Sequence, residues 1–211
     1  MKEIFRTVTF DPKDGGLPYR RAVLMVVFNR QGKIFIGEST KIPADGKSWQ
    51  MPQGGMKEYL QGGAWLSERA SQAARRELKE ELGSAAQFDL IRTLPERLIY
   101  NFPDNNPKYR GQVLTPILAR CASPDGNFNI GNREEGDALP AFSDWKWADV
   151  REVLRGVTAV KYQLYEQVLE SAAPIIAGAT MTQRQRRDAG ASGMVRPVAS
   201  RKLSNTAPLF Y

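Results

Sequence analysis

The fold of this chain is decided by one stretch, which reads Gly62-Gly-Ala-Trp-Leu-Ser-Glu68-Arg-Ala-Ser-Gln-Ala-Ala-Arg-Arg76-Glu77-Leu-Lys-Glu80-Glu81-Leu-Gly83. Ser67 is a good N-cap residue, and Gly83 stands where a helix commonly ends in a left-handed residue. The pattern therefore predicts a helix from Ser67 to Leu82. Its buried stripe is predicted to contain the residues that recur every four positions: Ala70, Ala74, Leu78 and Leu82.

Three glutamates of this helix share one face, because Glu77, Glu80 and Glu81 are spaced i, i+3, i+4. Like charges on one face repel each other, and the helix dipole also disfavours anions near the C-terminal end. A bound Mg²⁺ would relieve both costs, because carboxylate oxygens are among its preferred ligands. It also keeps several water ligands, which leaves room for phosphate oxygens. Arg76 can pair with a nearby carboxylate and fix its orientation. The alternative is a solvated acidic face balanced by three bases of the same helix: Arg75, Arg76 and Lys79.

Composition narrows the chemistry that is open to such a site. The chain has 211 residues, of which 42% are hydrophobic and 25% charged, so one domain with a full core and a tail can form. There is no histidine, which excludes imidazole bases and histidine zinc sites and leaves carboxylates to bind hard cations such as Mg²⁺ or Mn²⁺. The single cysteine, Cys121, favours a reducing, intracellular compartment, with the cytoplasm first and an organelle matrix second.

Most of the net charge of +7 is carried by residues near the C-terminal end. From Met181 onward six bases stand against one acid, Asp188, so this segment carries +5 and residues 1–180 carry +2. We expect a domain of residues 1–178 and a basic tail of residues 179–211 that is disordered or bound to a partner, with RNA or a ribonucleoprotein as the expected partner and no membrane association. The alternatives are a solvated tail without a partner and a tail whose terminal Leu209-Phe210-Tyr211 docks on a protein groove. The six bases are Arg184, Arg186, Arg187, Arg196, Arg201 and Lys202.

Apolar runs and turn residues predict the remaining elements. A hairpin is expected over residues 20–40, a loop rich in proline and glycine over 43–63, and strands within 84–122 that are broken at 101–108. A strand around Trp145 and Trp147 should place both indoles on one face, and a second helix is expected over 158–173. Alternating strands and helices favour an α/β architecture with a mixed sheet between helices.

The complete spacing around the first helix is G-x5-E-x7-R-E-U-x-E-E-x-G, where U is a bulky aliphatic residue, and every position is filled. This pattern resembles the Nudix box, which implies a Nudix α/β/α sandwich with a mixed sheet, here followed by the basic tail. Further segments resemble the subgroup of RNA pyrophosphohydrolases and dinucleoside polyphosphate hydrolases, and together they cover about residues 18–172: Tyr19-Arg20, Trp49-Gln-Met-Pro-Gln-Gly-Gly55, Tyr109-Arg-Gly-Gln112, Phe142-Ser-Asp-Trp-Lys-Trp147 and Val160-Lys161.

The resemblance implies an Mg²⁺- or Mn²⁺-dependent hydrolase that cleaves a pyrophosphate bond in a nucleoside diphosphate-linked substrate. RNA 5′ ends and dinucleoside polyphosphates are the first candidates. One of Glu80 and Glu81 is expected to orient or deprotonate the attacking water. The implied catalytic residues are Glu77, Glu80, Glu81 and Arg76. The implied metal ligands are Glu77, Glu80, Glu81 and Gly54, and the implied substrate contacts are Arg20, Gln53, Gly55 and Lys161.

Three departures from the subgroup pattern motivate an alternative. Residues 56–63 are inserted between the Gly54-Gly55 pair and Glu68, and Glu38-Ser-Thr40 replaces the expected arginines. Ala141 stands where the subgroup has a glutamate that helps to hold metal or activate water. The nearby acids that would have to substitute for it are Glu134, Glu135, Asp137 and Asp144. The alternative is a catalytically weak or inactive Nudix-fold subunit of an RNA-binding or ribonucleoprotein complex.

Overall fold

The structure is a computed structural model, which describes residues 5–7, 9–10, 15–41, 46, 48–102, 106–131 and 139–180. The six bases of the tail lie outside these ranges, so the predictions about them stay predictions. Three of the acids named as substitutes for the missing glutamate, Glu134, Glu135 and Asp137, also lie outside the described residues. Within the described ranges, no helix is both long and apolar enough to span a membrane.

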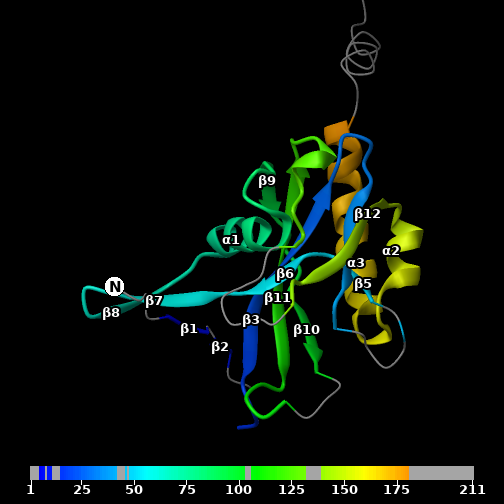
Figure 1. Cartoon of the computed structure of the whole chain (residues 1–211). Coiled ribbons are helices and arrows are strands. Elements are labelled where there is room, and N and C mark those ends of the chain that lie inside the picture. Colours follow the sequence, from blue (N-terminus) through cyan, green and yellow to red (C-terminus); the bar gives the residue numbers. More distant parts are fainter. Residues whose placement is uncertain are drawn as a thin grey trace, which may run out of the picture. The chain divides into compact units, whose positions relative to one another are not determined.

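A mixed sheet forms the centre of the domain (Figure 1). Its two longest strands, β3 (Tyr19–Phe28) and β11 (Gly111–Cys121), run parallel, with a register from Tyr19↔Gly111 to Phe28↔Arg120. The main path is completed by β10 (Leu98–Asn101), β4 (Ile34–Ser39) and β12 (Phe142–Ala148). Short strands pair alongside: β2 (Thr9–Phe10), β5 (Trp49–Gln50), β6 (Gln53–Gly55) and β9 (Phe88–Thr93).

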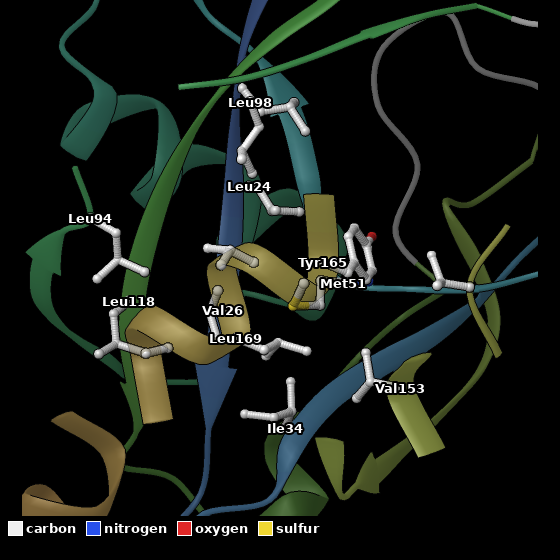
Figure 2. Packing of buried hydrophobic residues seen from close by; sticks show 14 of the residues in the cluster. Leu24, Val26, Ile34, Met51, Leu94, Leu98, Leu118, Val153, Tyr165 and Leu169 are labelled. Carbon is white, nitrogen blue, oxygen red and sulfur yellow. The ribbon is translucent and has the colours of Figure 1, made fainter. Parts of the chain in front are cut away.

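Strand β3 separates two hydrophobic cores, because alternate residues of a strand point to opposite faces. Leu24 and Val26 belong to the core that α2 (Val150–Gly156) and α3 (Ala159–Thr180) cover, which Figure 2 shows from close by. Val23 and Met25 belong to the other core, which α1 (Ala70–Leu82) covers. A strand buried on both faces needs a continuous apolar run, which residues 22–28 provide. The predicted α/β/α sandwich is thereby confirmed.

Helix α1 begins three residues later than predicted. Ser67 is not its N-cap but the last residue of β8 (Ala64–Ser67), where its hydroxyl donates to Glu58 Oε1 at 2.6 Å. Arg69 is the N-cap residue, and its backbone N donates to Gln72 Oε1 at 2.8 Å. At the other end Gly83 has a φ of +95°, a conformation that glycine adopts without strain. Three residues of the predicted stripe are buried and the fourth, Ala70, is half-buried.

The prediction of a loop over residues 43–63 was wrong for its second half, which contains β5, β6 and β7 (Lys57–Gln61). Strands β7 and β8 form a hairpin whose turn is Gly62-Gly63, with φ of +58° and +82°. Both values are positive, as the tight hairpin turns that follow strand twist require. Strand β1 (Phe5–Thr7) pairs with the other edge of β7 and completes a three-stranded sheet (Figure 1).

The C-terminal part of the domain is more helical than predicted. Helix α2 was not expected; Asp149 caps it by accepting from the backbone N of Glu152. Helix α3 continues past Pro174 to Thr180, because Ile176 packs into the core beyond the proline. The prediction for the two indoles is confirmed, since the rings of Trp145 and Trp147 both lie within 6 Å of the Phe35 ring, at 5.5 and 5.8 Å between centroids.

Leu78 is the side chain whose loss should weaken the attachment of α1 to the sheet. It is 1% exposed, so Leu78→Ala is expected to lower the free energy of unfolding by about 2–5 kcal/mol through lost burial and a residual cavity. Leu66→Ala is the control, because Leu66 is 50% exposed and the expected change is within about 0.5 kcal/mol. Urea unfolding of both variants measures the difference, and equal destabilisation would contradict the assigned packing.

Candidate active site

Arg76 is the centre of a polar cluster on α1, called the Arg76 cluster below. Its Nε and Nη2 donate to the two carboxylate oxygens of Glu68 at 3.0 and 2.9 Å. Its Nη1 donates to Glu77 Oε1 at 2.7 Å and to Glu80 Oε2 at 2.8 Å, and Nη2 also donates to the carbonyl of Gly55 at 2.7 Å. A guanidinium has five N–H donors, and all five are engaged.

Glu68 ties the cluster to the inserted hairpin. Its carboxylate also accepts from the backbone N of Lys57 at 3.0 Å, and its own backbone N donates to the Lys57 carbonyl at 2.8 Å. Glu68 and Glu77 are buried, which is costly for carboxylates unless a cation pairs with them. Burial lowers the pKa of Arg76, but the hydrogen bonds and charges of Glu68 and Glu77 raise it more, so this side chain stays protonated.

Two glycines of β6 allow the chain to approach these groups closely. A Cβ on Gly54 would lie 1.7 Å from the carboxyl carbon of Glu77, and a Cβ on Gly55 would lie 2.1 Å from Arg20 Nη2. Gly54 pairs with Val23 and Gly55 with Ala22 in the antiparallel β3–β6 ladder. Neighbouring residues face opposite sides of a sheet, so β6 has Glu77 on its α1 side and Arg20 on its α3 side.

Lys161 lies on the α3 side of β6 and is buried. Its Nζ donates to Gln50 Oε1 at 2.9 Å and to Gln53 Oε1 at 3.2 Å, and it lies 5.5 Å from the centre of the Tyr100 ring. Burial lowers the pKa of Lys161 to about 8, although the negative charge of Glu81 opposes that change. The charge of Glu81 therefore acts on Lys161, and this interaction connects the acidic and basic sides of the site.

Tyr100 and Arg20 extend the basic side. Tyr100 donates its hydroxyl to Gln112 Oε1 at 3.1 Å; burial raises the pKa of that hydroxyl, while a hydrogen bond with Gln53 and the charge of Arg20 oppose the rise. Among the described residues, no hydrogen-bond partner lies within reach of the buried Arg20 Nε. Arg20 and Lys161 are thus two cationic groups on the same side of β6, Arg20 against Gly55 and Lys161 bonded to Gln53.

The donor chemistry of the α1 face fits a hard divalent cation. Glu77, Glu80 and Glu81 offer carboxylate oxygens, and Gly54 brings backbone against Glu77. When ionised, the three carboxylates of the Arg76 cluster outweigh Arg76 and Lys57, and Glu81 adds a further negative charge. As the side chains stand, no three acidic or thiol groups in the described part of the chain are placed so that together they could hold a metal ion, and Arg76 engages both Glu77 and Glu80.

The structure brings most of the predicted site residues together around β6. Sequence analysis missed Lys57, whose Nζ lies 3.9 Å from Glu80 Oε1. It also gave no role to Glu68, although this residue fills the first glutamate position of the box pattern. Ala141 is half-buried against the core that α1 covers, and Asp144 is exposed on β12, where it accepts from its neighbour's backbone N.

Comparison with known proteins agrees with this arrangement. The chain matches the family described as NUDIX domain over residues 18–168, and it belongs to the Nudix family. It is 34% identical to an RNA pyrophosphohydrolase of Cereibacter sphaeroides over 80% of this chain and 98% of that protein. It is 32% identical to an RNA pyrophosphohydrolase of Sphingopyxis alaskensis over 76% of this chain and 96% of that protein.

Solved structures give matches at lower identity. The NUDIX domain of Shewanella oneidensis NrtR, complexed with ADP ribose, is 21% identical, with a TM-score of 0.45 over 76% of this chain and 92% of that chain. A NUDIX family hydrolase from Clostridium perfringens is 13% identical, with a TM-score of 0.46 over 74% of this chain and 97% of that chain.

The expectation of an enzyme is confirmed: the chain is a Nudix pyrophosphohydrolase. Nudix hydrolases generally use divalent metals, which agrees with the carboxylate face of α1. The alternative of an inactive subunit in an RNA-binding complex is not favoured by these matches.

The burial of Lys161 gives a stability prediction with a defined pH window. A pKa near 8 instead of the usual 10.5 means that charging Lys161 costs the folded state about 3 kcal/mol. This cost is fully present below pH 8 and disappears as the pH rises to about 10.5, where the unfolded chain also loses the proton. Wild-type stability relative to Lys161→Met should therefore rise by up to about 3 kcal/mol over that window.

Denaturant unfolding of both proteins at pH 7 and pH 10 measures this change. Met also leaves Gln50 and Gln53 without their donor, but that loss is the same at both pH values. A stability difference that stays constant with pH would show that Lys161 is not desolvated in the folded protein.

Proposed function

We propose that this chain hydrolyses the pyrophosphate bond at the 5′ end of RNA, with Mg²⁺ or Mn²⁺ as the cation. Dinucleoside polyphosphates are the second candidate substrates. The observation that carries the proposal is the division of the site by β6. Carboxylates for a cation lie on its α1 side, and the cationic side chains of Arg20 and Lys161 lie on the other. The names of the two bacterial relatives support RNA as the substrate.

Each side of β6 has a separate task in this proposal. Glu77, Glu80, Glu81 and the backbone of Gly54 would hold the cation, and Arg76 orients two of these carboxylates through its Nη1 donors. A bound divalent cation supplies positive charge at the phosphate oxygens and makes the attacking water more acidic. Either Glu80 or Glu81 would then orient that water or accept its proton.

Arg20 and Lys161 would bind the phosphates. Arg20 Nε has free donor capacity, and the Lys161 ammonium loses part of its desolvation cost when an anion arrives. Gln53 holds Lys161 in place through its side-chain oxygen at 3.2 Å. Because Ala141 provides no carboxylate, α1 is the main source of acidic groups at the site among the residues that the structure describes. The proton acceptor is therefore assigned to α1.

The glutamates of α1 are expected to be necessary for hydrolysis. Glu81→Gln keeps the size of the side chain and removes its charge, so turnover should fall by about 10²–10⁴-fold. The same variant should melt at the same or a higher temperature without metal, because one like charge is gone from the helix face. Release of phosphate or pyrophosphate from 5′-triphosphorylated RNA, with Mg²⁺ and with Mn²⁺, measures turnover.

Glu170→Gln is the matched control, since Glu170 is an exposed glutamate of α3 and its loss should leave turnover unchanged. Turnover that persists undiminished in Glu81→Gln would place the hydrolytic site elsewhere. A wild-type protein that releases nothing from any pyrophosphate substrate would contradict the proposed function itself.

We also propose that the basic tail strengthens RNA binding through its six bases. Each neutralised phosphate of a single strand releases about 0.7 of a counterion, so the tail should steepen the dependence of log K on log salt by up to about 4. The full chain and a chain truncated after Thr180, the last described residue, can be compared with one RNA over a range of salt. Equal slopes and equal affinities would remove the tail as an RNA-binding element.

A further inference from the structure

The inserted hairpin is fixed beside the Arg76 cluster. Strands β7 and β8 pair from Glu58↔Ser67 to Gln61↔Ala64, and β1 pairs with the outer edge of β7. At its base the hairpin is bonded to α1 through Glu68, which contacts both Lys57 and Arg76. The insertion is thus part of a three-stranded sheet with a defined position relative to α1.

One face of the hairpin is directed toward the glutamates. Lys57 marks this face, because its Nζ lies 3.9 Å from Glu80 Oε1. Side chains alternate along a strand, so Tyr59 and Gln61 lie on the same face as Lys57, at steps of about 7 Å. Leu66 joins them from β8, where it is paired with Tyr59. Trp65, paired with Leu60, lies on the opposite face.

A hollow of about 640 Å³ is lined by Tyr59, Gln61 and Leu66 of this face, by the neighbouring Leu60 and Ser67 of the same strands, and by two residues of α1. That volume is within the range of about 300–1,000 Å³ that is typical of small-molecule sites. Arg76 lines the hollow and bonds to Glu80, so the hollow adjoins the carboxylates that are proposed to act on the phosphates. Its lining residues are Tyr59, Leu60, Gln61, Leu66, Ser67, Glu68, Gln72 and Arg76.

The lining suits a flat aromatic group with polar edges. Tyr59 offers a ring for stacking, Leu66 offers apolar surface and is 50% exposed, and Gln61 and Gln72 offer amides for the edge of a base. The carboxylate of Glu68 does not repel such a group strongly, because both of its oxygens accept hydrogen bonds from Arg76.

We propose that this hollow binds a nucleobase of the substrate, so that the inserted hairpin is a base-recognition element. The proposed cation ligand Glu80 marks the end of the hollow that is nearest the phosphates, and the base lies farther along the hairpin, against Tyr59. This inference rests on the proposed function for the identity of the substrate. Its test measures binding and not hydrolysis, so the base site and the proposed hydrolysis can be contradicted independently.

The test compares two short RNAs with a 5′ diphosphate, one complete and one lacking the bases of its first two nucleotides. Binding to the full chain is measured in Ca²⁺, which takes the same oxygen ligands as Mg²⁺. Both RNAs carry the same phosphates, so the basic tail contributes equally to both. The complete RNA should bind the wild-type protein about 5- to 150-fold more tightly, the value of stacking one base on an aromatic ring.

Variants locate the preference in the hollow. Tyr59→Ala should abolish it and Tyr59→Phe should keep it, because the ring stacks and the hydroxyl does not. Leu66→Trp fills the hollow from the other strand and should also abolish it. Trp65→Ala is the matched control on the opposite face, and it should leave the preference intact.

Equal binding of the two RNAs by the wild-type protein, or a preference that survives both Tyr59→Ala and Leu66→Trp, would overturn the proposal. A preference lost equally in Trp65→Ala would do the same, since the hairpin fold and not the hollow would then be responsible. If the wild-type protein forms dimers and Tyr59→Ala makes them dissociate, the hollow binds a second copy of the chain and not a base. Base-selective binding without any turnover would contradict the proposed hydrolysis and leave the base site standing.

Discussion

The five hydrogen bonds of the Arg76 guanidinium hold together three elements that are separate in the sequence. They join α1 to the end of β8 through Glu68 and to β6 through the Gly55 carbonyl. The same side chain fixes Glu77 and Glu80 on the face of α1. Arginine suits this position because its planar fork presents all its donors at once and it stays charged when it is partly buried. Lysine, with three donors and no fixed plane, cannot replace these contacts.

This arrangement explains how the fold tolerates carboxylates in its interior. Glu77 and Glu81 are both buried on α1, where unpaired charges would be strongly unfavourable. Arg76 bonds to Glu77, and Lys161 lies within electrostatic reach of Glu81 from the other side of the site. The two cations therefore offset part of the buried negative charge, and the remaining negative charge on α1 favours a divalent cation. Stability and the proposed function are linked here, because the groups that are proposed to carry the chemistry are also costly to bury.

Several elements were predictable because their signal is local. The spacing of Glu77, Glu80 and Glu81 places them on one helix face wherever that helix packs. The apolar run of residues 22–28 supported a strand within the hairpin predicted over residues 20–40, and the structure confirms that strand as β3, which is buried on both faces. Predictions were wrong where the local signal is weak or where tertiary contacts override it. Ser67 was predicted to cap α1, but it is paired with Glu58 in the β7–β8 hairpin. The segment around Gln53 looked like loop, and only pairing with β3 makes it a strand.

The sequence alone determined the Nudix spacing, the acidic face of α1, the carboxylate chemistry forced by the lack of histidine, and the charge of the tail. All of these depend on residue identity and on the periodicity of a helix, which neighbouring residues fix. Only the tertiary structure decided that β6 separates acidic from basic groups, that Lys57 reaches Glu80, and that the insertion forms a hairpin beside a hollow. Those features depend on contacts between distant segments, whose geometry is set by packing the whole sheet between its helices.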